Sequence, residues 1–177
     1  FEGTDAELAQ TKVSQPAIMA VSLCALGAMK ENGIAFSGAA GHSLGEYAAM
    51  TAAEMLSVED AFKVIKARAE AMQKAAEATD GAMYAIIGKS AEEIEEVCAG
   101  VDGYVVPVNY NSTVQTVIAG ETAAAEKAAA KFAEMGAKAV KLGVSAAFHS
   151  KLMQPAADEF AEAIKNVSFA LGCCERN

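Results

Sequence analysis

Between Ala82 and Leu142 the sequence alternates short apolar runs with two helical patterns, and this succession constrains the fold more than any other feature. Four runs, at residues 83–87, 104–109, 114–119 and 139–142, have the length of strands. Residues 90–99 and 122–135 have the pattern of helices. The sequence therefore predicts the order strand, helix, strand, strand, helix, strand.

That β-α-β-β-α-β order is the ferredoxin-like arrangement. The flanking segments have a different pattern, with an apolar run at 36–40 and predicted helices at 15–32, 57–78 and 150–164. We therefore expect an α/β protein of two parts. Residues 1–80 and 144–177 form a partial α/β large subdomain, and residues 81–143 form an inserted ferredoxin-like small subdomain. The cleft between them is the expected ligand site.

Two of the flanking helices have clear boundaries. Residues 15–32 are apolar nearly all round, with Pro16 in the expected first turn and Gly33 just past the end, so we expect this helix to be covered on most sides. Ser57, with Asp60 three residues later, starts an amphipathic helix that runs to Ala78.

Composition excludes several classes of partner. The chain has 177 residues, 53% of them hydrophobic, and a net charge of −9 without a basic cluster, which argues against nucleic acid or an anionic membrane. No apolar run is expected to span a bilayer, and the four cysteines have no framework spacing, so we expect a reduced, cytoplasmic protein. Two histidines give little support for a metal site. The Cys173-Cys174 pair is interpreted as an unstructured tail.

Residues 41–45 read Gly-His-Ser-Leu-Gly and match the nucleophile elbow, in which a serine lies on a tight turn between a strand and a helix. The run 36–40 is the expected strand. Side chains at Gly41 and Gly45 are expected to collide with the turn, and the helix start offers amides to an oxyanion beside Ser43. The alternative is a glycine-rich turn whose serine only caps the helix.

A serine nucleophile needs a base, which is most often histidine. His42 adjoins Ser43 and points away from an elbow tip, which leaves His149 as the candidate base. Arg68 falls with the apolar residues of its helix, and a guanidinium there needs an anion, best matched by a carboxylate. From the helix alone, an internal salt bridge and a substrate carboxylate remain equal alternatives. The serine and base favour the substrate.

Four blocks closely resemble the malonyl-CoA:acyl-carrier-protein transacylase family of bacterial fatty acid synthesis, over about Thr11 to Phe169. They are Gly41 to Ala49, Ile65 to Arg68, Pro107 to Ser112 with Val117 to Gly120, and Phe148 to Ser150. The resemblance implies an α/β-hydrolase-like acyltransferase that needs no bound cofactor. Its implied partners are malonyl-CoA and acyl carrier protein.

The resemblance also implies roles for single residues. Ser43 forms a malonyl ester with His149 as general base, Arg68 grips the malonate carboxylate, and the Leu44 amide supplies half of the oxyanion hole. A backbone carbonyl orients the histidine in this family. Leu44 and Phe148 resemble malonyl-selective members, whereas Ala147 departs from the proline of many relatives.

The family extends beyond both ends of this chain, and residues 170–177 no longer resemble it. The missing parts hold the loop that completes the oxyanion hole and strands that pair with the elbow strand. One lost oxyanion donor costs ~10²–10³ in rate, so we expect weak or no activity from this chain, and we expect self-association through unpaired strands. The alternative functions are a serine esterase or thioesterase-type hydrolase and a non-catalytic fragment.

Overall fold

The strands predicted between Ala82 and Leu142 pair into a single four-stranded antiparallel sheet in the computed structural model, which describes residues 3–144 and 146–171. The element order is β1 (Ala82–Ile87), α5 (Ala91–Ala99), β2 (Val105–Ser112), β3 (Gln115–Gly120), α6 (Thr122–Glu134) and β4 (Lys138–Lys141). The strands lie in the order β2-β3-β1-β4. Each predicted strand and helix of this region is confirmed, although β2 extends beyond Asn109 to Ser112. Its pairing with β3 shifts register between Pro107 and Asn109 and again between Tyr110 and Ser112.

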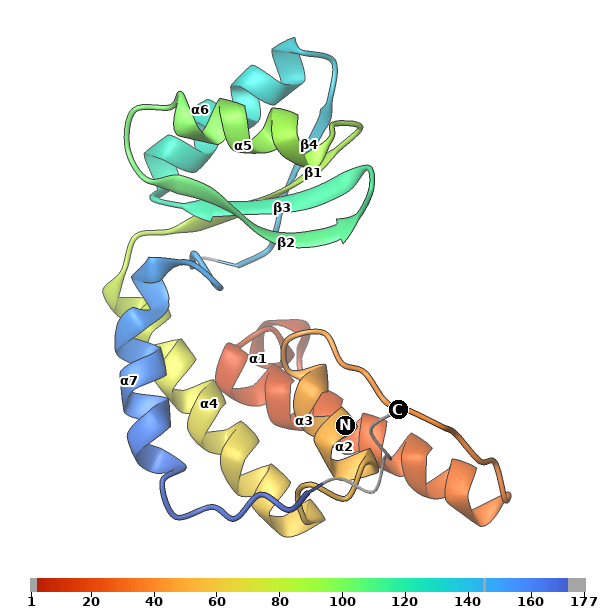
Figure 1. Ribbon diagram of the computed structural model, residues 1–177. Coiled ribbons are helices and arrows are strands. Elements are labelled where there is room, and N and C mark those ends of the chain that lie inside the picture. Colours follow the sequence, from red (N-terminus) through yellow and green to blue (C-terminus); the bar gives the residue numbers. More distant parts are fainter. Residues whose placement is uncertain (1–2, 145, 172–177) are drawn as a thin grey trace. The chain divides into compact units, whose positions relative to one another are not determined.

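The two faces of this sheet bury different partners because side chains alternate along a strand. Ile86 and Ile118 point to the face covered by α5 and α6, where Phe132 of α6 is fully buried. Figure 1 shows both helices over this one face. On the other face Met83 and Val117 pack against residues of the 142–152 segment, which are Leu142, Val144, Ala147, Phe148 and Leu152. The sheet thus anchors the segment that carries His149.

The chain divides into two compact units, which are described separately. Unit 2 is Lys74–Ala157 and contains the sheet, whereas unit 1 is Phe1–Gln73 with Asp158–Asn177. The helical elements outside the sheet region are α1 (Asp5–Leu8), α2 (Thr11–Glu31), α3 (Gly45–Ala52), α4 (Val58–Ala78), the short 3₁₀ helix η1 (Lys151–Met153) and α7 (Gln154–Ala163). Both α4 and α7 cross a boundary between the units. The predicted subdomain boundaries at 80/81 and 143/144 stay a prediction.

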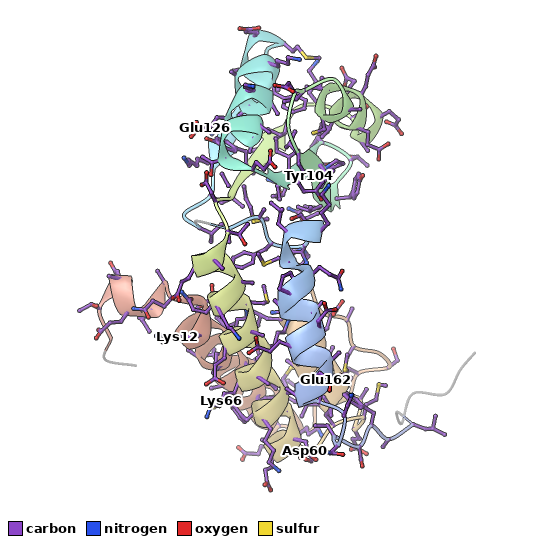
Figure 2. All side chains as sticks on the ribbon, turned by 90° about the vertical axis from the view of Figure 1, so that its left-hand side faces the viewer. Lys12, Asp60, Lys66, Tyr104, Glu126 and Glu162 are labelled. Atoms are coloured by element: carbon purple, nitrogen blue, oxygen red, sulfur yellow. The ribbon has the colours of Figure 1, made fainter. Side chains whose placement is uncertain are left out.

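The core of unit 1 lies where α2, α3 and α4 meet. Met19 of α2 packs with Leu56 and with Ala61 and Ile65 of α4, and partly buried Leu23, Leu44, Tyr47, Met50 and Val167 cover them. Helix α4 begins as predicted, because the Ser57 hydroxyl accepts a hydrogen bond from the Asp60 N–H at 3.0 Å. Figure 2 shows Asp60 at the start of α4 and Lys66 further along it.

The predicted elbow strand is wrong, because residues 36–40 form no strand. A strand requires a neighbour to bond to its backbone, and every strand in the described part of the chain belongs to the sheet of unit 2. Within residues 3–144 and 146–171, no backbone hydrogen bond within the chain is formed by residues 35–41.

Helix α2 also differs from expectation. It is four residues longer at its start than the predicted helix at 15–32, and only Gln15 and Met19 are buried, whereas Ile18 and Val21 are 49% and 53% exposed. An all-round apolar pattern does not specify how many neighbours a helix has. The prediction that no apolar run is long enough to span a bilayer is wrong, because α2 has the length and the apolar composition of a membrane-crossing helix. Core helices of soluble proteins and signal sequences also have this length and composition.

The cysteines fall into two groups. Cys24 is exposed and Cys98 is buried, and both are free thiols. The predicted tail with Cys173 and Cys174 lies outside the described residues.

Candidate active site

Ser43 lies on a tight turn that leads directly into α3. Its φ of 53° is in the left-handed region, which is uncommon for a residue other than glycine. The turn is closed by the Gly45 N–H, which donates to the His42 carbonyl at 3.0 Å, and by the Glu46 N–H, which donates to the Ser43 carbonyl at 3.1 Å. The backbone thus has the strained serine conformation that an elbow requires.

The two glycines of the motif have different roles. A Cβ atom at Gly41 would lie 2.1 Å from the Gly45 carbonyl carbon and 2.3 Å from the Glu46 nitrogen, so only glycine fits without movement of backbone. A Cβ at Gly45 would meet no described atom within 4 Å. The expected collision is therefore confirmed at Gly41 and wrong at Gly45.

The start of α3 leaves a backbone donor beside the serine. The N-cap is Leu44, without a side-chain hydrogen bond, so the capping interpretation of Ser43 gains no support. In the part of the chain that the structure describes, the Leu44 N–H has no hydrogen-bond acceptor. An amide in this position is available to a developing negative charge.

Arg68 of α4 is brought together with Ser43. Its Nη2 donates to the Ser43 Oγ at 2.9 Å, and its Nη1 donates to the Oε1 of Gln15 on α2. The guanidinium carbon also lies 5.6 Å from the centre of the Tyr47 ring. The arginine therefore contacts the candidate nucleophile and is held by α2 and α3 at the same time.

The partners of Arg68 are neutral. Among residues 3–144 and 146–171, no carboxylate forms an ion pair with it, which removes the internal salt bridge that sequence left open. Hydrogen bonds to an amide and a hydroxyl orient the guanidinium but leave its charge uncompensated. A partly buried cation of this kind favours an anionic ligand.

Tyr47 follows Ser43 by one turn and packs beside the guanidinium. Its ring makes an edge contact with Phe160 of α7, with 6.2 Å between ring centres. Burial raises the pKa of the Tyr47 phenol, and the Arg68 charge opposes that rise. The neutral Tyr47 ring, held by Phe160, thus packs against the guanidinium of Arg68.

His149 lies in unit 2, and its pairing with Ser43 stays a prediction. It is exposed, and its φ of 63° is also left-handed. The following residues fix this turn, because the Ser150 hydroxyl donates to the Ala147 carbonyl at 2.7 Å and the Lys151 N–H donates to the Tyr104 hydroxyl at 3.1 Å. Tyr104 is labelled in Figure 2. The exposed histidine therefore lies on a turn that is held by hydrogen bonds of the next two residues.

Sequence reasoning missed Gln15 and Tyr47. Gln15 precedes the core residue Met19 by one turn on the same face of α2, and a polar residue on such a face is the signal that could have found it. Tyr47 follows Ser43 by four residues, or about one helical turn, and this spacing is the signal that could have found it. In the described ranges no group of three or more histidine, cysteine or acidic side chains is arranged to hold a metal.

Comparison with known proteins places this chain in a family. Residues 2–171 match the acyl transferase domain, and the chain belongs to that family. It is similar to the malonyl CoA-acyl carrier protein transacylase of Bacillus subtilis, with 43% identity over 168 residues that cover 93% of this chain and 53% of the relative. The chain thus spans about half the length of the curated relatives it matches. The family match starts before Thr11, where the resemblance was expected to begin.

Solved structures agree with this assignment. The malonyl CoA-acyl carrier protein transacylase of Coxiella burnetii matches with a TM-score of 0.92 and 39% identity, over 97% of this chain and 55% of that one. A type II PKS acyl-carrier protein in complex with its malonyl-transacylase also matches, with a TM-score of 0.91, 40% identity, and coverage of 97% and 57%.

Proposed function

We propose that this chain carries the catalytic serine of a malonyl transferase, which moves a malonyl group from malonyl-CoA to the phosphopantetheine thiol of acyl carrier protein. The observation that carries this proposal is the contact between Arg68 and the Ser43 Oγ, made by a guanidinium whose described partners are all neutral. An acyl group bearing a free carboxylate supplies the missing anion. The similarity to proteins named for this reaction supports it.

The proposed chemistry follows from the roles of four residues. The Ser43 Oγ adds to the thioester carbonyl while His149 accepts its proton, and the Leu44 N–H donates to the oxyanion. The carbon–sulfur bond then breaks, and His149 returns the proton to the sulfur of CoA. The same steps in reverse, with the phosphopantetheine thiol as nucleophile, release the malonyl group from Ser43. Arg68 holds the malonyl carboxylate throughout, and no cofactor is required.

The fold assignment belongs to the same proposal. We assign residues 81–143 to an inserted ferredoxin-like subdomain, supported by the antiparallel β2-β3-β1-β4 order, and residues 1–80 and 144–177 to an α/β-hydrolase-like large subdomain. We further propose that the protein acts in the cytoplasm. Its surface lysines do not single out a docking site for the carrier protein, because most contact acidic groups, as Lys63, Lys66, Lys127 and Lys141 do.

Labelling tests the proposed function. The chain is incubated with malonyl-CoA to the end point, so that a slow reaction still accumulates product, and its mass is measured intact. We expect one malonyl group on the wild-type chain and none on the Ser43→Ala variant. Absence of the adduct from wild type, or its persistence in Ser43→Ala, would refute the proposal.

We also propose that copies of the chain associate through residues 36–40. This segment is exposed, and in the described part of the chain its backbone groups form no hydrogen bond with other backbone groups. Light scattering over a range of concentrations is expected to show species larger than a monomer, and introduction of Pro at Ala39 is expected to reduce them. A strictly monomeric wild-type chain would contradict this proposal.

A further inference from the structure

Gln15 has an unusual environment for an amide side chain. It is one of three buried polar residues in the described part of the chain, with 4% of its surface exposed, and the others are Thr51 and Thr116. The Thr51 hydroxyl donates to the Tyr47 carbonyl in its own helix, at 2.8 Å. Gln15 instead uses both ends of its amide on side chains of another helix, α4. A buried amide is costly unless it is satisfied, so these contacts fix its conformation.

The chemistry of the neighbours determines which way the amide faces. A guanidinium has only donors, so the atom that faces Arg68 Nη1 is the carbonyl Oε1. The Nε2 then faces the thioether of Met72, at 3.4 Å from its sulfur. Arg68 and Met72 lie one turn apart on α4, and the Gln15 amide lies between them in contact with both. The carbonyl cannot turn away from Arg68 without placing its NH₂ group against a cation.

The neutrality of Gln15 is as important as its position. Glutamate would accept the same hydrogen bond but would neutralise the guanidinium, whereas glutamine orients Arg68 and leaves its full positive charge for an external anion. With Oε1 on Nη1 and the Tyr47 ring beside the guanidinium plane, Nη2 is left directed at the Ser43 Oγ.

We propose that Gln15 is a positioning residue that fixes the guanidinium of Arg68 toward the acyl group on Ser43 while keeping that guanidinium electrically uncompensated. This inference rests on the proposed function for its substrate, but the orientation of Arg68 can be measured without any reaction.

The first experiment observes Arg68 itself by nitrogen NMR. The sequence has only two arginines, Arg68 and Arg176, so Arg68→Lys assigns the signals by subtraction. We expect separate, slowly exchanging Nη signals for Arg68 in wild type and their collapse in Gln15→Met, a change of at least about tenfold in rotation rate, which corresponds to about 1.4 kcal/mol. Gln10→Met, at the exposed N-cap of the same helix, is the matched control and is expected to retain them.

The second experiment separates orientation from charge. Gln15→Glu retains the acceptor, so we expect ordered Arg68 signals together with a loss of at least about tenfold in the rate of Ser43 labelling by malonyl-CoA. Labelling by acetyl-CoA, which has no carboxylate for Arg68, is expected to change less than twofold. Circular dichroism is used to check that both Gln15 variants fold. If Gln15→Met does not fold, the labelling rates of Gln15→Glu alone test the role of Gln15.

The outcomes distinguish the two proposals. Slowly exchanging Arg68 signals in a folded Gln15→Met variant, or malonyl labelling of Gln15→Glu at the wild-type rate, would overturn the role of Gln15. A wild-type chain that takes no malonyl group but shows Gln15-dependent Arg68 signals would refute the proposed function and leave the positioning role standing.

Discussion

Alanine substitutions at the two glycines of the serine turn are expected to change stability in opposite directions. At Gly41 the added Cβ would lie 2.1 Å from a backbone carbon, over 1 Å inside the 3.4 Å at which ordinary contact begins. The nearest atoms are backbone atoms of the first turn of α3, which cannot rotate aside as a flexible side chain can. We expect Gly41→Ala to lower the free energy of unfolding by about 3 kcal/mol.

Gly45→Ala is the matched control, because it adds the same methyl group four residues away. A Cβ there meets no described atom within 4 Å, and Gly45 is the first residue of α3, where alanine favours the helix. We expect it to raise the free energy of unfolding by about 0.5 kcal/mol.

Thermal unfolding followed by circular dichroism measures both effects. For a chain of this size 1 kcal/mol corresponds to roughly 2–4 °C, so Gly41→Ala is expected to melt roughly 6–12 °C below wild type and Gly45→Ala slightly above it. The malonyl label on Ser43 is expected to fall in Gly41→Ala because the turn is displaced. Equal melting temperatures for the two variants, or a lower melting temperature for Gly45→Ala, would contradict a steric clash at Gly41.

Three further outcomes are expected. Arg68→Ala should slow malonyl labelling of Ser43 by at least about tenfold and spare hydrolysis of simple esters, and equal losses would favour a general serine hydrolase. Ser57→Ala removes the cap of α4 and should cost about 1 kcal/mol in urea unfolding, whereas no change in midpoint would show that the cap is dispensable. Burial raises the pKa of the Cys98 thiol from 9.0 to about 11, so the unfolded chain releases this proton first and stability should fall as pH rises through that interval. Cys98→Val should flatten that decline, and an identical slope in both proteins would contradict the assignment.

The sheet region could be predicted from the sequence because its signals are local. Ser90 and Glu93 form a capping box at the start of α5, and the strand runs alternate between the two buried faces. Each element has its pairing partner within unit 2. The neighbours that the strands require are therefore supplied within the same region, and the periodicity of the sequence was sufficient to predict its elements.

The elements of unit 1 were predicted less well because they depend on neighbours. The run at 36–40 has the composition of a strand, but a strand exists only beside another strand. Ile18 and Val21 look like core residues and are about half exposed, since the sequence of a helix does not state which faces are covered. The same limit applies to Gln15: its polar side chain on the face of Met19 marks the position as unusual, but the sequence does not identify Arg68 of α4 as its partner.

Within the candidate site, the sequence identified the residues proposed to carry the chemistry but not the residues that hold them in place. Ser43 and Arg68 are in contact as their proposed roles require, and the two supporting residues, Gln15 and Tyr47, were found only through their distances to the guanidinium. Motifs record the reacting groups, whereas supporting contacts join residues that lie far apart in the sequence, as Gln15 and Arg68 do.

The left-handed backbone at Ser43 and at His149 has a consequence for how this chain can change. Each of these residues pays about 1–2 kcal/mol for a conformation that glycine adopts freely. Selection for thermal stability alone would therefore drive both positions toward glycine and remove the proposed nucleophile and its base in the same process. In a library selected for stability alone, without regard to chemistry, the side chains at these two positions should be among the first to be replaced.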